Sequence, residues 1–257
     1  MELFSLLIGI GASLGLLQVS RRAPSGQEFR WTFTGLLVLL SAFIGARLNY
    51  VLLHLSYYAR DPLSAWRFWE GGLSWPGALI LTIFAAFLSA LVLRTSLAAA
   101  ADTLIPLFPI MAIALWVGSA QSGIAYGARV NPEFQISLKV IHEDSLPSFH
   151  WPLQYAAALT LLALLWAGER SLNELKTVGN YAAQTGLMLG LHTLLFSWLR
   201  ADPAPVWNSY RLDYAAAGLL VVLSFLALII IGIIHLRASF SKDAPGKNNE
   251  NWFSPHE

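Results

Sequence analysis

Cysteine is absent from this chain of 257 residues, and charged residues are scarce, at 12%. Without cysteine there is no disulfide, no thiol nucleophile and no thiolate ligand for a metal. The six histidines are scattered and show no spacing typical of metal ligands. The formal net charge is +1 and no basic stripe appears, which argues against a nucleic-acid partner.

Apolar residues, by contrast, are abundant. They make up 56% of the chain, and the mean hydropathy is +0.57. Soluble domains carry about twice this fraction of charge, so the composition predicts an all-α integral membrane protein. One helical bundle is expected over residues 1–239, followed by a polar, disordered cytoplasmic tail over 240–257. The first apolar run begins at Leu3 with no basic residue before it, which favours a retained helix over a signal peptide.

Seven stretches are long and apolar enough to be transmembrane helices. They cover residues 3–19, 33–55, 75–94, 104–122, 152–168, 178–199 and 214–236. Lys and Arg number nine on one side of these helices and six on the other, with Arg47 inside a helix. The positive-inside rule then favours an outer N-terminus and a cytoplasmic C-terminus. Glycines at a spacing of four, Gly11/Gly15 and Gly186/Gly190, predict close packing between helices.

Arg47 is a charge within the second predicted helix. Tyr50, His54 and Tyr58 follow it at i+3, i+7 and i+11, so one face of this helix carries a polar column. An ionisable residue at membrane depth is a functional hypothesis by default. Two interpretations stay open: the side chain reaches up to the headgroup region, or its guanidinium binds a phosphate or lipid headgroup.

Five segments of the chain resemble motifs of the prolipoprotein diacylglyceryl transferase family. In chain order they are GARLNYV at 45–51, EGGLSWPG at 70–77, GSAQSGIAYG at 118–127, FHWPLQYAA at 149–157 and LRADP at 199–203. The first two are specific by themselves, and the other three gain weight from their order. The resemblance implies seven helices with the N-terminus outside, which agrees with the distribution of basic residues.

The resemblance also implies a reaction, the transfer of diacylglyceryl from phosphatidylglycerol to the thiol of a lipobox cysteine during lipoprotein biosynthesis. It implies a multi-pass protein of the bacterial plasma membrane that meets membrane lipid and prolipoprotein signal peptides and uses no cofactor. A monomer is expected. Such chemistry needs a cation at the phosphate leaving group and a group that deprotonates the thiol.

The residues that match the family's pattern divide into two sets. The catalytic candidates are His150 and Arg200. The candidates for lipid binding are Arg47, Tyr50, Gly71, Gly72, Gly127, Tyr155 and Arg200. Arg47 and Arg200 are expected to line one anionic headgroup site.

Four positions depart from the family's pattern. Trp116 stands at the position of an arginine, Pro76 at a histidine, Ser119 at an asparagine and Ile124 at a glutamate. Tryptophan cannot donate a charge-assisted bidentate bond, and proline cannot accept a proton. Two hypotheses follow, a transferase with a rearranged site and a non-catalytic phospholipid-binding homologue. A small transporter or channel is the third, and the lack of an internal repeat argues against a transporter built on inverted repeats.

Overall fold

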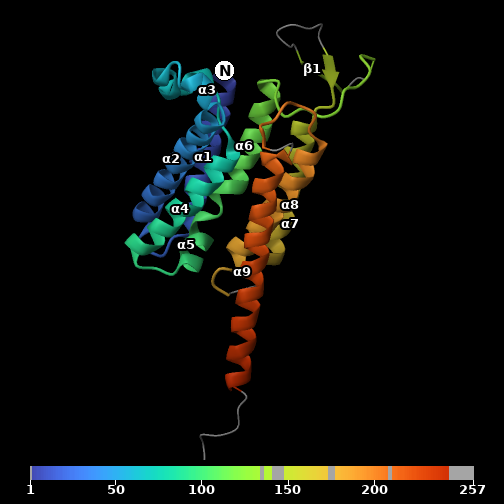
Figure 1. The fold of residues 1–257 in the computed structure, drawn as a ribbon. Helices are drawn as coiled ribbons and strands as arrows, with labels where there is room; N and C mark the ends of the chain where they lie inside the picture. The colour runs from blue at the N-terminus through green and yellow to red at the C-terminus, as the bar shows by residue number, and fades with distance from the viewer. Residues whose placement is uncertain (1, 134–135, 141–147, 173–176, 208–209, 243–257) are drawn as a thin grey trace, which may run out of the picture.

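The computed structural model describes residues 2–133, 136–140, 148–172, 177–207 and 210–242. In this part of the chain the long helices run side by side as an elongated bundle (Figure 1). The last helix extends beyond the others at one end, and the short strands lie at the opposite end. The predicted all-α class is confirmed apart from these strands. The predicted tail at 240–257 lies outside the described residues from position 243 on.

The long helices coincide with the seven predicted stretches. They are α1 (Glu2–Arg22), α2 (Glu28–Leu53), α4 (Trp75–Leu93), α6 (Leu107–Gln121), α7 (Leu153–Leu172), α8 (Asn180–Leu199) and α9 (Leu212–Lys242). The short helical elements are α3 (Leu55–Tyr58), η1 (Pro62–Trp66), η2 (Phe68–Glu70) and α5 (Leu97–Leu104). Two antiparallel hairpins pair β1 (Leu138–Val140) with β2 (Ser148–His150) and β3 (Val206–Trp207) with β4 (Tyr210–Arg211).

Five helical stretches among the described residues are long and apolar enough to cross a membrane. They are Leu3–Arg22, Glu28–Leu53, Trp75–Leu93, Leu97–Gln121 and Leu212–Arg237. The apolar part of α7 is shorter, Leu153–Gly168, and α8 is not among the five. The polar residues of α8 explain this difference, because Asn180, Thr185 and His192 are buried against other helices.

Helix pairs determine how the bundle packs: α1 lies along α6, α2 along α4, and α8 along α9. The glycines predicted to allow close packing lie at two of these contacts. A Cβ atom added to any of them would come within 3.1 Å of the neighbouring helix, at Gly11, Gly15, Gly186 and Gly190. The tightest contact joins Gly45 of α2 to Gly77 of α4, where a Cβ on either glycine would collide with the carbonyl oxygen of the other. This contact holds segment 45–51 beside segment 70–77.

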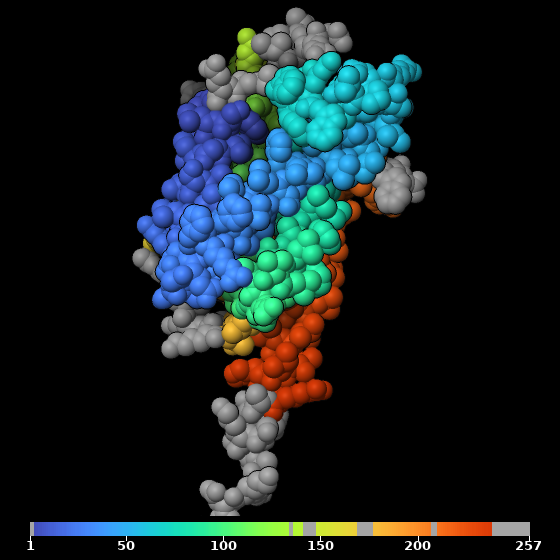
Figure 2. Space-filling model, turned by 90° about the vertical axis from the view of Figure 1, so that its left-hand side faces the viewer, coloured from blue at the N-terminus to red at the C-terminus, as the bar shows by residue number. Residues whose placement is uncertain are grey.

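The lateral surface of the bundle is apolar. Large side chains such as Leu40, Phe84, Leu159 and Ile230 are each at least half exposed. Figure 2 shows α1, α2 and α4 together on one such face, with the segment that follows α2 covering one end. Such continuous apolar exposure would be unfavourable in water and suits contact with lipid chains.

Candidate functional site

Arg47 is almost completely buried, with 4% of its surface exposed. Its Nε donates a hydrogen bond to one backbone carbonyl, and each terminal nitrogen donates to two more. The five acceptors lie in the segment that follows α2 and belong to Ser64, Ala65, Arg67, Gly71 and Gly72. A guanidinium has five N–H donors. All five have an acceptor here, so no donor of Arg47 remains for a phosphate.

The two glycines of segment 70–77 adopt backbone angles that suit this arrangement. Gly71 has a φ of 85° and Gly72 a φ of 75°, a region that side chains disfavour. A Cβ on Gly72 would also lie 2.5 Å from the ring of Tyr50. Nearby, the side-chain amide of Asn49 donates to the Ser74 hydroxyl at 2.7 Å. Hydrogen bonds and close contacts therefore hold segments 45–51 and 70–77 together.

The residues predicted to form a polar column contact one another, but they do not share one helix, because α2 ends at Leu53 and Tyr58 belongs to α3. The rings of Tyr50 and His54 stack with centroids 4.2 Å apart, and Tyr58 meets Tyr50 edge-on at 6.5 Å. The guanidinium of Arg47 lies 5.4 Å from the Tyr58 ring centre. The rings of Tyr58 and Phe68 thus lie beside the buried cation.

A second cluster joins the other three segments. The backbone N–H of Ala201 donates to the carbonyl of Tyr126 at 2.9 Å. The N–H of Ala125 donates to the Asp202 carboxylate at 3.1 Å. Ala125 has a φ of 60°, which is unusual for a residue with a side chain. These contacts tie segment 118–127 to segment 199–203 and hold its strained turn in place.

Segment 149–157 closes the same cluster from the other side. The Gln154 side chain is fully buried, and its amide nitrogen donates to the carbonyl of Ile124 at 2.6 Å. The Nδ1 of His150 lies 3.0 Å from the Gly127 carbonyl, and its Nε2 lies 2.9 Å from the Ser148 hydroxyl. Because a carbonyl only accepts, Nδ1 carries the proton and Nε2 keeps its lone pair toward the hydroxyl.

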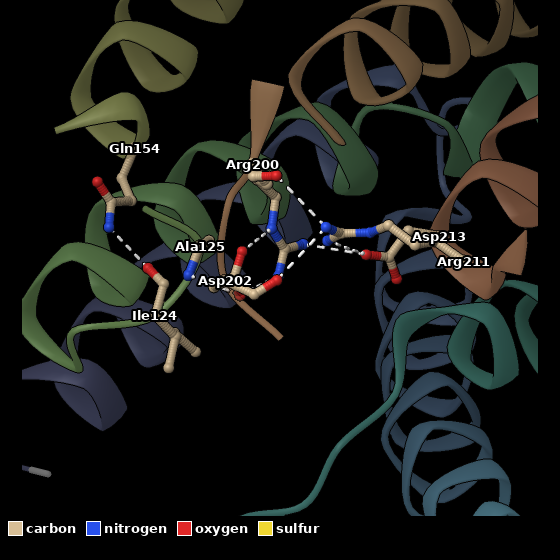
Figure 3. Close-up of polar contacts among 7 residues, drawn as sticks. All are labelled: Ile124, Ala125, Gln154, Arg200, Asp202, Arg211 and Asp213. Carbon is tan, nitrogen blue, oxygen red and sulfur yellow. Dashed lines mark hydrogen bonds and ion pairs between the residues drawn. The ribbon is translucent and has the colours of Figure 1, made fainter. Parts of the chain in front are cut away.

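Two buried aspartates and two partly buried arginines complete this cluster, as Figure 3 shows. Arg200 binds Asp202 through two nitrogens, at 2.8 and 2.6 Å, and lies 3.4 Å from Asp213. Arg211 contacts the same Asp213 oxygen at 3.2 Å and also donates to the carbonyls of residues 200 and 202. The two arginines and two aspartates sum to zero charge. The Nε of Arg211 is buried and has no hydrogen-bond partner in the part of the chain that the structure describes.

The surroundings shift two acid–base equilibria in this cluster. Burial lowers the pKa of Arg200, but the hydrogen bond to Asp202 and the charges of Asp202 and Asp213 outweigh it, so the pKa is raised. Burial, and then the charge of Asp202, raise the pKa of the Tyr126 phenol. Both residues therefore stay protonated at neutral pH.

Trp116 lies among aromatic residues between helices α6 and α8. Its ring meets Phe196 at 5.9 Å and His192 at 6.5 Å, both edge-on. The Nε2 of His192 lies 3.0 Å from the carbonyl of Ala157 on α7. The position that holds an arginine in the family's pattern is thus occupied by an apolar contact between helices.

The other three departures from the family's pattern have simple structural roles. Pro76 lies in the first turn of α4, where a backbone N–H would have no acceptor within the helix, so proline loses no hydrogen bond there. The backbone carbonyl of Ser119 accepts the N–H of Ile124 at 3.1 Å, which shapes the turn after α6. The Ile124 side chain is 49% exposed and supplies no polar group.

The predicted site residues therefore fall into two clusters. Arg47, Tyr50, Gly71 and Gly72 belong to the first. Gly127, His150 and Arg200 belong to the second. Tyr155 lies at its edge, with its hydroxyl accepting from Gln121 at 3.3 Å. Arg47 and Arg200 share no hydrogen-bond partner among the described residues.

The structure also identifies residues that the sequence analysis missed. Asp202, Arg211 and Asp213 form the buried ion cluster, and Gln154 anchors the turn at Ile124. A signal for the first three was present, because the pattern Arg-x-Asp occurs twice, at 200–202 and 211–213. Among the described residues, no three His, Asp or Glu side chains are placed to hold a metal ion.

The fold and these two clusters define a multi-pass membrane protein whose five motif-like segments gather at one end of a helical bundle. Comparison with known families agrees with this description. The model of the family "LGT: Prolipoprotein diacylglyceryl transferase" matches residues 1–236. The chain belongs to the prolipoprotein diacylglyceryl transferase family.

Several curated relatives are each named phosphatidylglycerol–prolipoprotein diacylglyceryl transferase. The one from Nitratidesulfovibrio vulgaris is 26% identical over 202 residues, which cover 76% of this chain and 71% of the relative. The one from Bordetella parapertussis is 31% identical over 172 residues, or 63% of this chain and 65% of the relative. The one from Polynucleobacter asymbioticus is 37% identical over 102 residues, or 37% of this chain and 38% of the relative. The aligned parts thus span between about a third and three quarters of these relatives.

Proposed function

We propose that this chain is a diacylglyceryl transferase that moves diacylglyceryl from phosphatidylglycerol to the thiol of a lipobox cysteine. One observation carries the proposal: five segments far apart in the sequence gather at the same end of the bundle. Segments 45–51 and 70–77 are hydrogen-bonded to each other, and segments 118–127, 149–157 and 199–203 are hydrogen-bonded together. This grouping supports the proposal even though four side chains of the family's pattern are replaced.

The proposed topology places this end outside the cytoplasm. Seven helices cross the bacterial inner membrane, with the N-terminus outside and the C-terminus in the cytoplasm. The distribution of Lys and Arg supports this orientation, with nine on the cytoplasmic side and six on the outer side. The partners are phosphatidylglycerol and the signal peptides of prolipoproteins, and the protein acts as a monomer without a cofactor.

The reaction would require a base for the thiol, and His150 has the geometry for this role. Its Nδ1–H is held by the Gly127 carbonyl, which leaves the Nε2 lone pair as the proton acceptor. In the structure this lone pair accepts a hydrogen bond from the Ser148 hydroxyl. A cysteine thiol bound in place of this hydroxyl would pass its proton to Nε2 and become a thiolate.

The thiolate would then attack the carbon of the diacylglyceryl group that is bonded to the phosphate oxygen. The carbon–oxygen bond breaks, a thioether forms, and glycerol phosphate leaves with the electron pair. A cation must stabilise this leaving group. Arg47 has no free donor, and Arg200 is neutralised by two carboxylates. We assign the contact to Arg211, because it pairs with Asp213 alone and its Nε has no hydrogen-bond partner among the described residues.

A non-catalytic phospholipid-binding role is the second candidate, and a specific observation favours it. Trp116 fills the position of the family's arginine with an aromatic contact to Phe196 and His192. Loss of one preorganised donor to a developing oxyanion costs about 3 kcal/mol of barrier. If Arg211 does not compensate for this loss, the protein binds phosphatidylglycerol and transfers nothing.

Expression in cells depleted of their own diacylglyceryl transferase separates these candidates. A reporter lipoprotein with a lipobox cysteine is analysed by mass spectrometry for the thioether-linked diacylglyceryl group. The transferase proposal predicts the modification with the natural chain and its loss with Arg211→Gln or His150→Gln. The exposed Arg129→Gln serves as the matched control and should keep it.

The other outcomes are equally informative. Phosphatidylglycerol bound to the purified protein without any modified reporter would favour the non-catalytic candidate. If the reporter is not modified and phosphatidylglycerol does not bind, both candidates are refuted. Ion conductance in liposomes that contain the protein would instead support a channel.

A further inference from the structure

A cavity of about 60 Å³ lies at the end of the bundle opposite the two clusters. It is lined by α1, α7 and α8 and by the chain around the start of α6. Helices α6 and α8 begin beside it and end in segments 118–127 and 199–203, so most of the length of these helices separates it from the proposed transfer site. None of the residues discussed above as site candidates lines it.

The polar lining of the cavity comes from two helices. Gln18 and Arg22 belong to the last turns of α1, and Tyr181 and Thr185 to the first turns of α8. The remaining lining is proline, isoleucine, leucine and methionine, with one glycine, Gly168. The cavity therefore joins a polar part with one cation to an apolar part, a combination that matches an anionic amphiphile.

Arg22 is held in a way that leaves it available to an anion. Its guanidinium carbon lies 3.7 Å from the centre of the Tyr181 ring, which is close stacking. Stacking occupies the flat face of the group and leaves the N–H edge open. Among the described residues no acidic side chain pairs with Arg22. A preoriented guanidinium without a carboxylate suits bidentate contact with a phosphate.

The size of the cavity limits what can enter it. A whole phospholipid is far larger than this cavity, which has room only for a small polar group. The acyl chains of a bound lipid would have to lie along the apolar outer surface of the helices. Exposed side chains such as Leu164 of α7 provide that surface.

We propose that this cavity binds the phosphate headgroup of an anionic phospholipid from the leaflet at this end of the bundle. Arg22 contacts the phosphate, and Tyr181 holds the guanidinium in position. With the topology proposed above, this leaflet is the cytoplasmic one. The site is separate from the proposed transfer site, and it does not depend on whether the chain is a transferase.

Lipid binding to the purified protein tests this proposal by native mass spectrometry in detergent. The probe is phosphatidic acid, which is anionic and is not the proposed diacylglyceryl donor, compared with zwitterionic phosphatidylcholine. Arg22→Gln should weaken binding of phosphatidic acid about ten-fold, since a hydrogen-bonded charge is lost. Arg21→Gln is the matched control, because Arg21 is an adjacent arginine that is also exposed and does not line the cavity. It should bind phosphatidic acid as the natural chain does.

Two further variants keep the proposal testable if Arg22→Gln does not fold. Arg22→Lys keeps the charge without the planar stack and should bind with intermediate affinity. Gly168→Leu keeps Arg22, fills the cavity and should abolish the preference for phosphatidic acid over phosphatidylcholine. Equal losses in Arg21→Gln and Arg22→Gln would show diffuse attraction to charge and overturn the proposal. Competition by inorganic phosphate at equal concentration would assign the site to free phosphate instead of a lipid.

Discussion

Replacement of Arg47 by methionine should destabilise the protein more than any other single change in segments 45–51 and 70–77. The five carbonyls from Ser64 to Gly72 that accept from the guanidinium would lose their donors at once. A hydrogen bond to a charged group is worth about 1.5–3 kcal/mol, but five bonds from one side chain are not additive. Breaking a buried charged network costs about 3–5 kcal/mol, and we expect Arg47→Met to fall in that range.

Chemical unfolding in detergent, with proteolysis of segment 60–75 as a local readout, measures this effect. Arg67→Met is the matched control, because its side chain lies in the same segment and is 46% exposed in its ion pairs with Asp61 and Glu70. Exposed pairs are worth at most about 1 kcal/mol. Arg47→Lys should be nearly as harmful as Arg47→Met, since an ammonium has three donors and no planar fork. Stability of Arg47→Met equal to that of Arg67→Met would refute the reasoning.

Three other changes probe the remaining contacts. Gly77→Ala should cost about 1–3 kcal/mol of stability through overpacking against α2, whereas Gly9→Ala, which has open space, should cost nothing in the same unfolding experiment. Asp202→Asn should cost about 3 kcal/mol by removing the bidentate carboxylate partner of Arg200, and increased proteolysis at 123–127 would report it. The raised pKa of Tyr126 predicts stability that is complete below its unfolded value of about 10 and is lost as pH rises through the folded value. Tyr126→Phe should therefore flatten the alkaline branch of the stability curve, and an unchanged branch would contradict the assignment.

The positions of the helices could be predicted because their cause is local. Apolar runs of bilayer length predict which segments form the long helices. Glycines at a spacing of four predict where two helices pack closely. The contact between Tyr50 and His54 at the end of α2 could likewise be predicted, since residues four apart share a helix face. The partners of Arg47 could not be predicted, because they are backbone carbonyls and any sequence in segment 64–72 supplies carbonyls.

The second cluster shows a different limit. His150 and Arg200 were identified from motif resemblance, but their contacts depend on how three distant segments meet. The buried role of Asp202 follows from its pairing with Arg200 and the Ala125 N–H, and only the fold brings these together. The burial of polar residues on α8 could not be predicted for a similar reason. Its polar side chains face other helices, which hydropathy alone does not reveal.

A transfer assay with purified protein tests the central proposal most directly. The protein is placed in lipid nanodiscs that contain phosphatidylglycerol and is mixed with a synthetic lipobox peptide. The released glycerol phosphate and the mass of the peptide are followed together. The proposal predicts one glycerol phosphate for each thioether-linked diacylglyceryl peptide, with both lost in Arg211→Gln and kept in Arg129→Gln. If the natural chain releases no glycerol phosphate and leaves the peptide unmodified, the chain is not a transferase.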